Sequence, residues 1–355
     1  MSEKIKIGII GTGGISAEHM KAYTQNPNVE LYAFCDIIED RAAEKAREYG
    51  VERVFTDYNE MLKLTEIDAV SICTWNAAHA PCTIAALNAG KHVLCEKPTA
   101  MSTAEAVSMK EAADKSGKLL MIGFVRRCGN DCEILKEFIE KDFLGEIYYA
   151  KATYLRKLGN PGGWFGDKSL SGGGPLIDLG VHVIDLVKYL IGNPKPISVY
   201  GAAFAKLDAR NNVKGKKIYK SAHSTEDDIC NVEDLAAAMI RFDNGTVLSV
   251  ETSFSLHTDT DEGKIELFGT KGGAKLLPEL KLYTEMNNYM TDINIDADTA
   301  LDFAGLFKNE IDHFVSCIRN NTPCISTAQD GVDIMKILDA VYESARTGHE
   351  VVLEG

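Results

Sequence analysis

Four polar residues recur along one strongly apolar stretch of the chain. Asp178, His182, Asp185 and Tyr189 stand at i, i+4, i+7 and i+11 within residues 175–191. In an α-helix this spacing places them on one face. Burial of such groups is costly unless they are paired or line a cleft, and an acid beside an imidazole in a cleft is suited to general acid–base catalysis. A satisfied pair in the core and an Asp–His–Asp metal site, which would need further ligands, are the alternatives.

A second group of reactive residues is the triplet Glu96-Lys97-Pro98, which ends an apolar run. Ligands in open α/β sheets bind outside the carboxyl ends of the strands, so Lys97 is expected to point at a cofactor crevice. Its ammonium group can donate a hydrogen bond to a substrate hydroxyl and stabilise a developing alkoxide. Pro98 fixes the backbone and is a candidate for a cis peptide bond. The alternative is a surface lysine in a turn.

A glycine-rich loop, Gly11-Thr12-Gly13-Gly14-Ile15-Ser16, follows the first apolar run and precedes a helical pattern. In a dinucleotide-binding fold the first glycine permits the tight turn, and the second lets the backbone approach the pyrophosphate. The phosphates then lie at the helix N-terminus, where free N–H groups and the helix dipole attract them. Ser16 stands where a Gly or Ala is usual. The loop therefore predicts a dinucleotide site, with Gly14 and Ile15 on the phosphate side.

Asp36 ends the second predicted strand, at the distance from the loop that the dinucleotide fingerprint requires. A carboxylate there accepts hydrogen bonds from the adenosine ribose hydroxyls and repels the additional phosphate of NADP. We therefore expect NAD rather than NADP, although Arg41 nearby would suit a phosphate. The alternative is a cluster of turn glycines with an exposed aspartate.

The elements that must position these residues alternate through the first third of the chain. Their apolar runs are nearly continuous, which is typical of strands buried on both faces of a parallel sheet. The order predicts a doubly wound α/β domain over residues 1–124. The predicted strands are 4–10, 29–36, 69–74, 92–97 and 119–124, and the predicted helices are 14–25, 39–49, 78–89 and 103–116.

Residues 125–355 change in character and predict an α+β domain. Strands at 235–242 and 246–254 flank Asp243-Asn244-Gly245, a hairpin signal. Strands at 263–269 and 273–277 flank a second turn, so the sheet is expected to be antiparallel. The other predicted elements are a long strand at 147–157 and helices at 175–191, 301–319 and 329–347.

Composition excludes several classes of protein. The 355 residues carry a formal net charge of −14, and 45% of them are hydrophobic, as in soluble globular proteins. The acidic balance argues against a nucleic-acid partner, and we expect neither a membrane segment nor a signal peptide. The nine cysteines are scattered, and the pair Cys128 and Cys132 lacks a second pair to complete a zinc site. We therefore expect reduced thiols in a cytoplasmic protein and no metal.

Taken together, these motifs resemble the glucose–fructose oxidoreductase / inositol dehydrogenase / rhizopine catabolism (Gfo/Idh/MocA) family. The individual motifs are short, but their order and spacing span nearly the whole chain. They are Gly11-x-Gly13, Asp36, Thr74-x-Asn76-x-x-His79, Glu96-Lys97-Pro98, Arg126-Arg127, Gly172–Gly174, Asp178-x-x-x-His182 and Phe268-Gly269-Thr270-Lys271-Gly272.

The resemblance implies an N-terminal Rossmann domain and a C-terminal α+β domain with a large, open, mostly antiparallel sheet. One face of that sheet would carry the substrate cleft, and the other would mediate assembly into a homodimer or homotetramer, since an uncovered sheet is a liability. The resemblance assigns Thr74, Asn76, His79 and Glu96 to the cofactor side. Trp75 departs from the proline found in many members.

Members of this family commonly oxidise a ring hydroxyl of a sugar, cyclitol or sugar derivative with NAD(P). The resemblance implies that Lys97, Asp178 and His182 are the catalytic trio and that Arg127 lies at the substrate cleft. In the implied mechanism His182 accepts the hydroxyl proton while hydride leaves the same carbon for the nicotinamide. Lys97 is the alternative base, if burial and neighbouring groups depress its pKa.

Two further residues are candidates for substrate binding. Trp164 follows Pro161-Gly162-Gly163 and would either stack on a sugar ring or anchor the loop in the core. Arg156, on the long strand, would point into the cleft or into solvent.

Three functions are compatible with these motifs. An NAD-dependent dehydrogenase of carbohydrate metabolism is favoured. The alternative is an NAD-retaining glycosidase or lyase, which oxidises the sugar transiently and then eliminates the glycosidic group. A sensor without catalysis would be expected to lack the trio, yet Lys97, Asp178 and His182 are all present.

Overall fold

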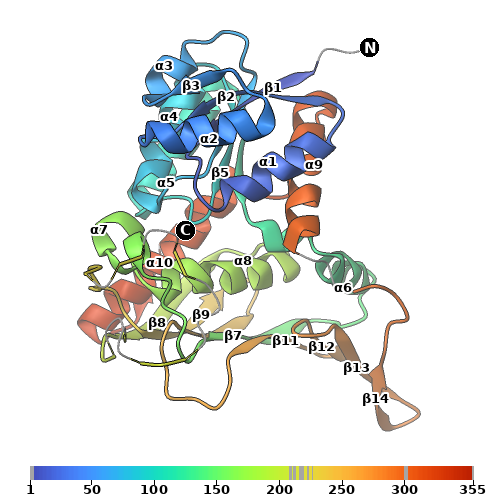
Figure 1. Ribbon diagram of the computed structural model, residues 1–355. Helices are drawn as coiled ribbons and strands as arrows, with labels where there is room; N and C mark the ends of the chain where they lie inside the picture. Colours follow the sequence, from blue (N-terminus) through green and yellow to red (C-terminus); the bar gives the residue numbers. More distant parts are fainter. Residues whose placement is uncertain are drawn as a thin grey trace. The chain divides into compact units, whose positions relative to one another are not determined.

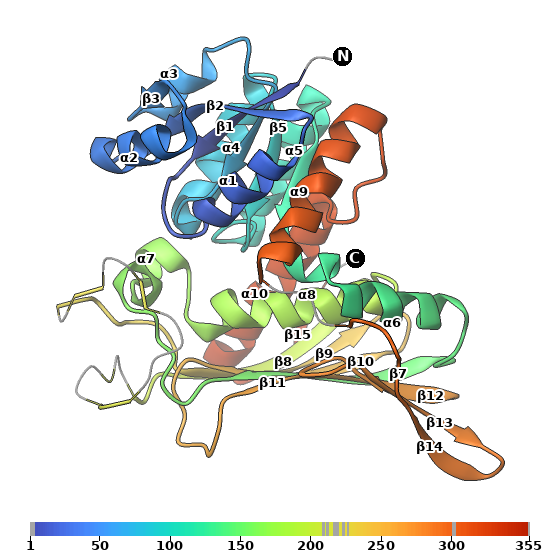
Figure 2. The ribbon, with the colours of Figure 1, turned by 45° about the vertical axis from the view of Figure 1, so that its right-hand side comes forward.

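We describe the protein from a computed structural model. The described residues are 4–207, 210, 213–215, 220–221, 224–225, 227–299 and 303–353. The chain forms two compact units, and each consists of two segments of sequence. Unit 1 comprises Met1–Cys128 and Asp302–Val332, and unit 2 comprises Gly129–Leu301 and Asp333–Gly355. Figures 1 and 2 show the elements of each unit.

Unit 1 is built on a parallel sheet of six strands in the order β3-β2-β1-β4-β5-β6. This order confirms the predicted doubly wound Rossmann fold. The switch point lies between β1 and β4, where Ile10 pairs with both Cys35 of β2 and Ile72 of β4. The strands are β1 (Ile5–Ile10), β2 (Val29–Cys35), β3 (Arg53–Phe55), β4 (Ala69–Ile72), β5 (His92–Glu96) and β6 (Leu120–Gly123).

Helices flank this sheet, with α1 beside α9 and α4 beside α5 (Figures 1 and 2). The central strands β1, β4 and β5 are buried along all or nearly all of their length, as their continuous apolar sequences predict. The helices of unit 1 are α1 (Ser16–Gln25), α2 (Glu39–Tyr49), α3 (Tyr58–Leu62), α4 (His79–Asn88), α5 (Thr103–Ser116), α9 (Phe303–Asn320), and the 3₁₀ turns η1 (Asn76–Ala78) and η2 (Val125–Cys128).

Unit 2 is built on a nine-stranded sheet in the order β14-β13-β12-β11-β7-β10-β9-β8-β15. Strand β10 pairs in parallel with β7, and the other neighbours pair antiparallel. This confirms the predicted open, mostly antiparallel sheet. The strands are β7 (Ile147–Leu155), β8 (Pro196–Phe204), β9 (Leu235–Phe242), β10 (Val247–Ser253), β11 (Glu262–Gly269), β12 (Gly272–Lys275), β13 (Lys281–Met286), β14 (Tyr289–Ile293) and β15 (Val351–Val352).

Helix α8 packs on β7 and β10 along one face of this sheet (Figure 1). On the other face, Tyr200 of β8 and Met239 of β9 are direct cross-strand partners and are 56% and 51% exposed. The sheet therefore has one buried face and one that carries exposed apolar side chains. The helices of unit 2 are α6 (Asn130–Glu140), α7 (Lys168–Ser171), the 3₁₀ turn η3 (Gly163–Gly166), the π-helix η4 (Leu176–Gly180) and α8 (Val181–Leu190). Helix α10 (Ala328–Thr347) begins in unit 1 and ends in unit 2.

The two structural units do not coincide with the two domains predicted from the sequence. The predicted domains, 1–124 and 125–355, meet at a single boundary, and this domain division stays a prediction. In the structure α9 packs against α1, so residues 302–332 belong to the unit that contains the Rossmann sheet. Buried contacts, not order along the chain, set this division.

One segment of unit 2 has the length and composition of a membrane-spanning helix. Among the residues that the structure describes, it is Lys168–Leu190, and 78% of its most apolar window is buried inside the structure. The sequence itself predicts no membrane segment. A buried core helix passes the same test of length and hydropathy.

Candidate active site

The glycine loop in unit 1 begins at a position that only glycine fits. Gly11 has φ +85°, and a Cβ atom there would lie 2.7 Å from the carbonyl oxygen of Cys73 and 2.9 Å from the Thr74 side chain. The loop after β1 therefore runs directly against the end of β4. This contact gives Gly11 the tight-turn role that the sequence predicted.

Packing within the chain does not explain the glycine at position 13. A Cβ atom at Gly13 would meet nothing within 4 Å, so the chain's own packing does not require glycine there. Ile15, the residue before α1, makes no side-chain capping bond to the helix, and the Ser16 hydroxyl donates back to the Gly13 carbonyl at 2.6 Å. A glycine next to an uncapped helix N-terminus leaves room and free N–H groups for phosphate. The loop thus fits a dinucleotide pyrophosphate.

Asp36 lies directly after β2 and fastens the loop to that strand. Its Oδ2 atom accepts hydrogen bonds from the Thr12 N–H at 2.8 Å and the Thr12 hydroxyl at 3.1 Å. Its Oδ1 atom accepts from the Ile38 N–H at 2.9 Å, and Arg41 pairs with Oδ2 at 3.4 Å. Since a carboxylate has about four acceptor positions, Oδ1 retains capacity for one ribose hydroxyl. The pairing of Arg41 with Asp36 also engages the cation that would suit an NADP phosphate.

Lys97 follows β5, and the residue before it is tied into a buried polar network. The Lys97–Pro98 peptide bond is cis, as the sequence suggested. Glu96 accepts from the Lys97 N–H at 3.1 Å and pairs with His19 Nε2 at 2.8 Å. Burial opposes ionisation of Glu96, but His19, and then Lys97 and His79, outweigh burial and lower its pKa. Glu96 therefore stays ionised and holds the backbone of Lys97.

His19 was missed by sequence reasoning. It lies on α1, is fully buried, and its Nδ1 atom faces the Ser71 hydroxyl at 3.3 Å. The residue thus links the helix that begins at the glycine loop to the strand end that carries Lys97. No local spacing in the sequence connects position 19 with position 96.

The Thr74-x-Asn76-x-x-His79 motif forms the turn between β4 and α4. Both ring nitrogens of buried His79 face carbonyl oxygens, that of Pro98 at 2.7 Å and that of Thr74 at 3.2 Å. Burial lowers the pKa of His79, so its imidazole is neutral and has one N–H to donate. The shorter contact is to the Pro98 carbonyl, so His79 holds the start of α4 to the turn after β5. The predicted cofactor contacts of Thr74, Asn76 and His79 stay predictions.

Arg127 is an internal residue of unit 1. Its side chain is fully buried, its Nη1 atom donates to the Ile325 carbonyl, and it pairs with the Asp330 carboxylate at 3.2 Å. Its guanidinium also lies over the Phe124 ring at 5.2 Å. These bonds fix the segment between α9 and α10 to the end of β6. The predicted role of Arg127 toward substrate stays a prediction.

In unit 2, the polar stripe lies on the helical segment that packs on the sheet. Asp178 belongs to the π-helix η4, and His182 lies in the first turn of α8. Asp178, His182 and Tyr189 are partly exposed, whereas the apolar residues between them are buried. Asp185 is 1% exposed and so departs from the predicted stripe. The single helix predicted at 175–191 thus contains a π-helical turn, a feature frequent at functional sites.

Glu233, which sequence reasoning also missed, binds the start of this helical segment. It lies just before β9, and its carboxylate accepts from the N–H groups of Gly174 at 2.9 Å and Leu176 at 3.1 Å. Pro175, between them, has no N–H to offer. The hydroxyl of Tyr342 on α10 donates to the same carboxylate at 2.9 Å. A buried anion at a helix N-terminus fixes the entry of the segment that carries Asp178 and His182.

The glycine run before Pro175 makes room for these contacts. Gly172 ends α7 with φ +83°. A Cβ atom at Gly173 would lie 2.0 Å from the Tyr342 hydroxyl, and one at Gly174 would lie 2.4 Å from the Glu233 carbonyl oxygen. Small residues are therefore required here so that Glu233 and Tyr342 reach the helix.

The two further candidates for substrate binding also lie in unit 2. Arg156 is 9% exposed, so it does not point into solvent, and its guanidinium donates to the Gly159 carbonyl at 3.3 Å. Trp164 lies in η3, is partly exposed, and stacks on Phe165 with ring centroids 4.0 Å apart. Asp228 accepts from the Gly163 N–H and so holds this turn. Neither arrangement decides between structural and substrate-binding roles, which stay predictions.

Sequence models of two protein families match the chain. One is described as "Oxidoreductase family, NAD-binding Rossmann fold" and matches residues 5–124. The other is described as "Oxidoreductase family, C-terminal alpha/beta domain" and matches residues 136–353. The two matches together cover most of the chain.

One curated relative and one solved structure match nearly the whole chain, and a second relative matches about three quarters of it. A D-glucoside 3-dehydrogenase of Escherichia coli K12 is 35% identical over 355 residues, which covers 99% of this chain and 98% of that protein. A myo-inositol 2-dehydrogenase of Thermotoga maritima is 28% identical over 76% of this chain and 74% of that protein. A solved structure of levoglucosan dehydrogenase, in complex with NADH and L-sorbose, has a TM-score of 0.88 and 25% identity, and covers 99% of this chain and 100% of that chain.

Proposed function

Because the chain belongs to the Gfo/Idh/MocA oxidoreductase family, we propose that it oxidises a ring hydroxyl of a sugar, glycoside or cyclitol with NAD. The observation that carries this proposal is the similarity over 99% of the chain to a D-glucoside 3-dehydrogenase. The alternative of glycoside cleavage by transient oxidation gains no support from the compared proteins, whose names are those of dehydrogenases.

The residues of unit 1 are proposed to hold NAD. The loop Gly11 to Ile15 would take the pyrophosphate, and Asp36 would accept a hydrogen bond from the adenosine ribose. Thr74, Asn76, His79 and Glu96 would line the cofactor side of the strand ends. When bound, the nicotinamide supplies the hydride acceptor. NAD rather than NADP is favoured because the Asp36 carboxylate, which is 6% exposed and ordered by Thr12, would repel a 2′-phosphate.

Lys97, Asp178 and His182 are proposed to act on one substrate hydroxyl. His182 would accept the proton, while Lys97 and Asp178 would orient the hydroxyl and stabilise its developing charge. The opposite assignment, in which Lys97 is the base, remains the second mechanism. Arg156 and Trp164 are proposed to bind substrate. Arg127, whose side chain is buried and paired with Asp330, is proposed to position the substrate cleft.

The activity is tested by NADH formation across a panel of glucosides, aldoses, anhydrosugars and cyclitols. Lys97→Met and His182→Ala are expected to lower kcat by at least about 100-fold, the usual contribution of a positioned proton donor or acceptor, while NAD affinity measured separately stays within a few-fold. Lys115→Met and His349→Ala, exposed residues of units 1 and 2, are the matched controls. Near-normal turnover in either site variant excludes the role of that residue. Release of aglycone without net NADH would instead indicate glycoside cleavage.

The cofactor site is tested by a pair of glycine variants. Gly13→Ala is expected to leave the thermal midpoint unchanged, since its Cβ would meet nothing within 4 Å, and to weaken NAD binding. Gly11→Ala is expected to destabilise unit 1 by about 1–3 kcal/mol through its backbone conformation alone, before the contact with Cys73. Unchanged NAD affinity in Gly13→Ala, measured by fluorescence titration, would contradict the assignment of the loop.

We also propose that the protein is a cytoplasmic homodimer or homotetramer that pairs through the exposed face of the unit 2 sheet. Tyr200 and Met239 lie next to each other on that face. Tyr200→Glu combined with Met239→Lys is expected to give a smaller species in size-exclusion chromatography with light scattering. A wild-type protein that is a monomer by the same measurement would refute the proposal.

A further inference from the structure

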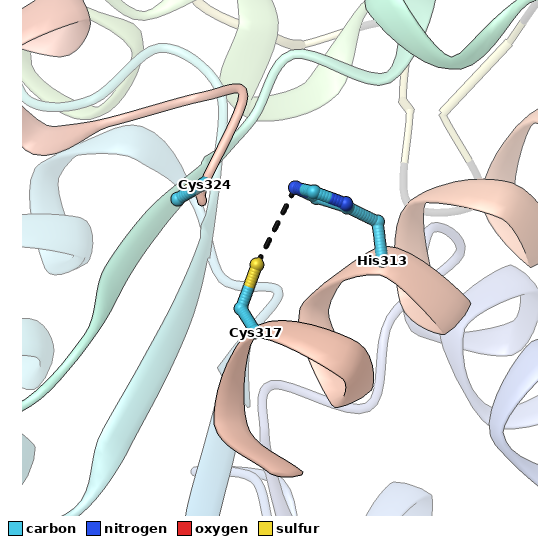
Figure 3. A group of neighbouring side chains, drawn as sticks. All are labelled: His313, Cys317 and Cys324. Atoms are coloured by element: carbon cyan, nitrogen blue, oxygen red, sulfur yellow. Dashed lines mark hydrogen bonds between the residues drawn. The ribbon is translucent and has the colours of Figure 1, made fainter. Parts of the chain in front are cut away.

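A cluster of metal-ligating side chains lies in unit 1 among residues that the proposed reaction does not use. His313 and Cys317 stand at i and i+4 on α9, and Cys324 lies in the segment between α9 and α10. One ligand atom from each lies within 4.8 Å of the others. Figure 3 shows the His313 ring directed toward Cys317. The His313 Nε2 atom lies 3.4 Å from the Cys317 sulfur. Two thiols and one imidazole from two stretches of chain therefore converge on one point.

The distances suit a tetrahedral metal. With bonds of about 2.3 Å from zinc to sulfur and about 2.05 Å to nitrogen, ligand atoms of a tetrahedral site lie roughly 3.6–3.8 Å apart. The observed Nε2–Sγ distance of 3.4 Å is close to that value, and the limit of 4.8 Å on the other pairs requires only small side-chain movements. Two cysteines and one histidine are also a ligand set that zinc uses with a fourth position open.

The tautomer of His313 is the one that binding requires. The Ile325 N–H donates to His313 Nε2 at 3.1 Å, so this nitrogen carries a lone pair and Nδ1 carries the proton. Burial lowers the pKa of His313, which keeps the ring neutral. A metal would replace the Ile325 N–H at the same lone pair. The imidazole is thus directed at the site by the backbone of the segment that supplies Cys324.

The site is reachable and its thiols are reduced. His313 and Cys324 are partly exposed, Cys317 is 8% exposed, and both cysteines are free. Burial raises the pKa of Cys324 to about 12 and also raises that of Cys317. Each thiol therefore gives up its proton when the metal binds, and the two Zn–S bonds form with release of two protons to solvent.

We propose that His313, Cys317 and Cys324 bind one divalent cation of the zinc class, which joins α9 to the segment that follows it. Two hydrogen bonds between Ser326, in that segment, and Ile122 of β6 hold the segment in unit 1. The Ser326 hydroxyl donates to the Ile122 carbonyl at 2.5 Å, and the Ser326 carbonyl accepts from the Ile122 N–H at 3.1 Å. The cation would strengthen this attachment from the α9 side. The cation would take no part in hydride transfer.

The test is metal binding to the full-length, reduced, metal-free protein. Titration with Co²⁺ is expected to give a sulfur-to-cobalt charge-transfer band and the intense visible bands of a tetrahedral site, at one metal per chain. Zn²⁺ should displace Co²⁺ and raise the thermal midpoint. Its affinity should increase with pH because two protons are released. Cys324→Ser and His313→Gln are each expected to lower Zn²⁺ affinity by at least about 100-fold, since even residues that only support a ligand contribute about 10–100-fold.

Cys128→Ser is the matched control, because Cys128 is a partly exposed cysteine of the same unit outside the cluster. It should bind zinc as the wild type does. Absence of the charge-transfer band in the wild type would overturn the proposal, as would a band that survives in both Cys324→Ser and His313→Gln. A disulfide between Cys317 and Cys324 that forms under mild oxidation, with no metal binding by the reduced protein, would overturn it in favour of a redox pair. None of these measurements depends on dehydrogenase activity.

Discussion

The hydroxyl of Tyr342 offers the sharpest test of how the helix with Asp178 and His182 is held. It is one of three donors to the buried carboxylate of Glu233, at 2.9 Å. Burial, and then the charge of Glu233, raises the pKa of Tyr342 well above its ordinary value, so the hydroxyl stays protonated and donates. Tyr342→Phe removes the bond to Glu233 and keeps the ring.

A hydrogen bond to a charged group contributes about 1.5–3 kcal/mol to stability. Tyr342→Phe should lower the free energy of unfolding of unit 2 by that amount. At about 2–4 °C per kcal/mol for a unit of this size, the midpoint should fall by about 3–12 °C. The assay is urea and thermal unfolding followed by the fluorescence of Trp164, in a Trp75→Phe background so that only unit 2 reports.

Gly173→Ala perturbs the same contact from the other side. Its Cβ would lie 2.0 Å from the Tyr342 hydroxyl oxygen and 2.8 Å from Ile177 Cγ1. Overpacking of this kind costs about 1–3 kcal/mol. In the double variant with Tyr342→Phe the hydroxyl is gone, so part of that cost should disappear, and the coupling energy should be about 0.5–3 kcal/mol.

Gly263→Ala is the control for the glycine substitution, because a Cβ there would meet nothing within 4 Å. It should be additive with Tyr342→Phe. If Gly173→Ala and Tyr342→Phe are also additive to within about 0.5 kcal/mol, the reasoning about the glycine run is refuted.

Three further outcomes are expected. Glu310 is buried near Glu96, and burial, followed by the charge of Glu96, raises its pKa well above 4.5. Protonated Glu310 therefore contributes its full stability below about pH 4.5. This contribution is lost as the pH rises and the carboxyl group ionises. Glu310→Gln should therefore gain stability relative to wild type between pH 5 and 9, and a constant difference in urea unfolding over that range would count against it. Asp36→Asn should lower the ratio of kcat/KM with NAD to kcat/KM with NADP. An unchanged ratio would show that the Asp36 charge does not exclude the 2′-phosphate of NADP. His79→Phe removes the bond to the Pro98 carbonyl, so it should lower the free energy of unfolding by about 1–3 kcal/mol, and unchanged stability would show that this bond is not needed.

Most of the architecture of unit 1 could be predicted from the sequence. Strands buried on both faces produce continuous apolar runs, and the helices at 39–49 and 103–116 have the bounds that were predicted. Strand β3 and helix α3 were missed because three and five residues are too short to show a period. Strand β8 was missed because its buried face includes Pro196 and Gly201, which are poor strand signals.

The sequence predicts only part of the site, and the residues that it does not reveal are those that hold the others in place. Motif spacing identified the glycine loop, Asp36, Lys97 and the polar stripe. Residues that hold these groups from far along the chain, such as His19 and Glu233, have no local signal, because their partners are 77 and 57–109 residues away. The expectation of no metal rested on the cysteine spacing and on the incomplete ligand set of Asp178, His182 and Asp185. The cluster at His313 combines a helical i, i+4 pair with a loop cysteine, a pattern outside the usual zinc spacings.

The interleaving of the two units also has a consequence for how the protein is made. Glu310 and Phe307 of α9 are buried in unit 1, and Phe307 lies against His19 of α1 with ring centroids 5.4 Å apart. A ribosome synthesises eight of the nine strands of the unit 2 sheet, β7 to β14, before it reaches α9. The Rossmann strands must therefore wait, with the surface that α9 covers still exposed to solvent, until nearly the whole chain has emerged. A fragment that ends near residue 128 should accordingly aggregate rather than fold, although it contains every strand of the nucleotide-binding sheet.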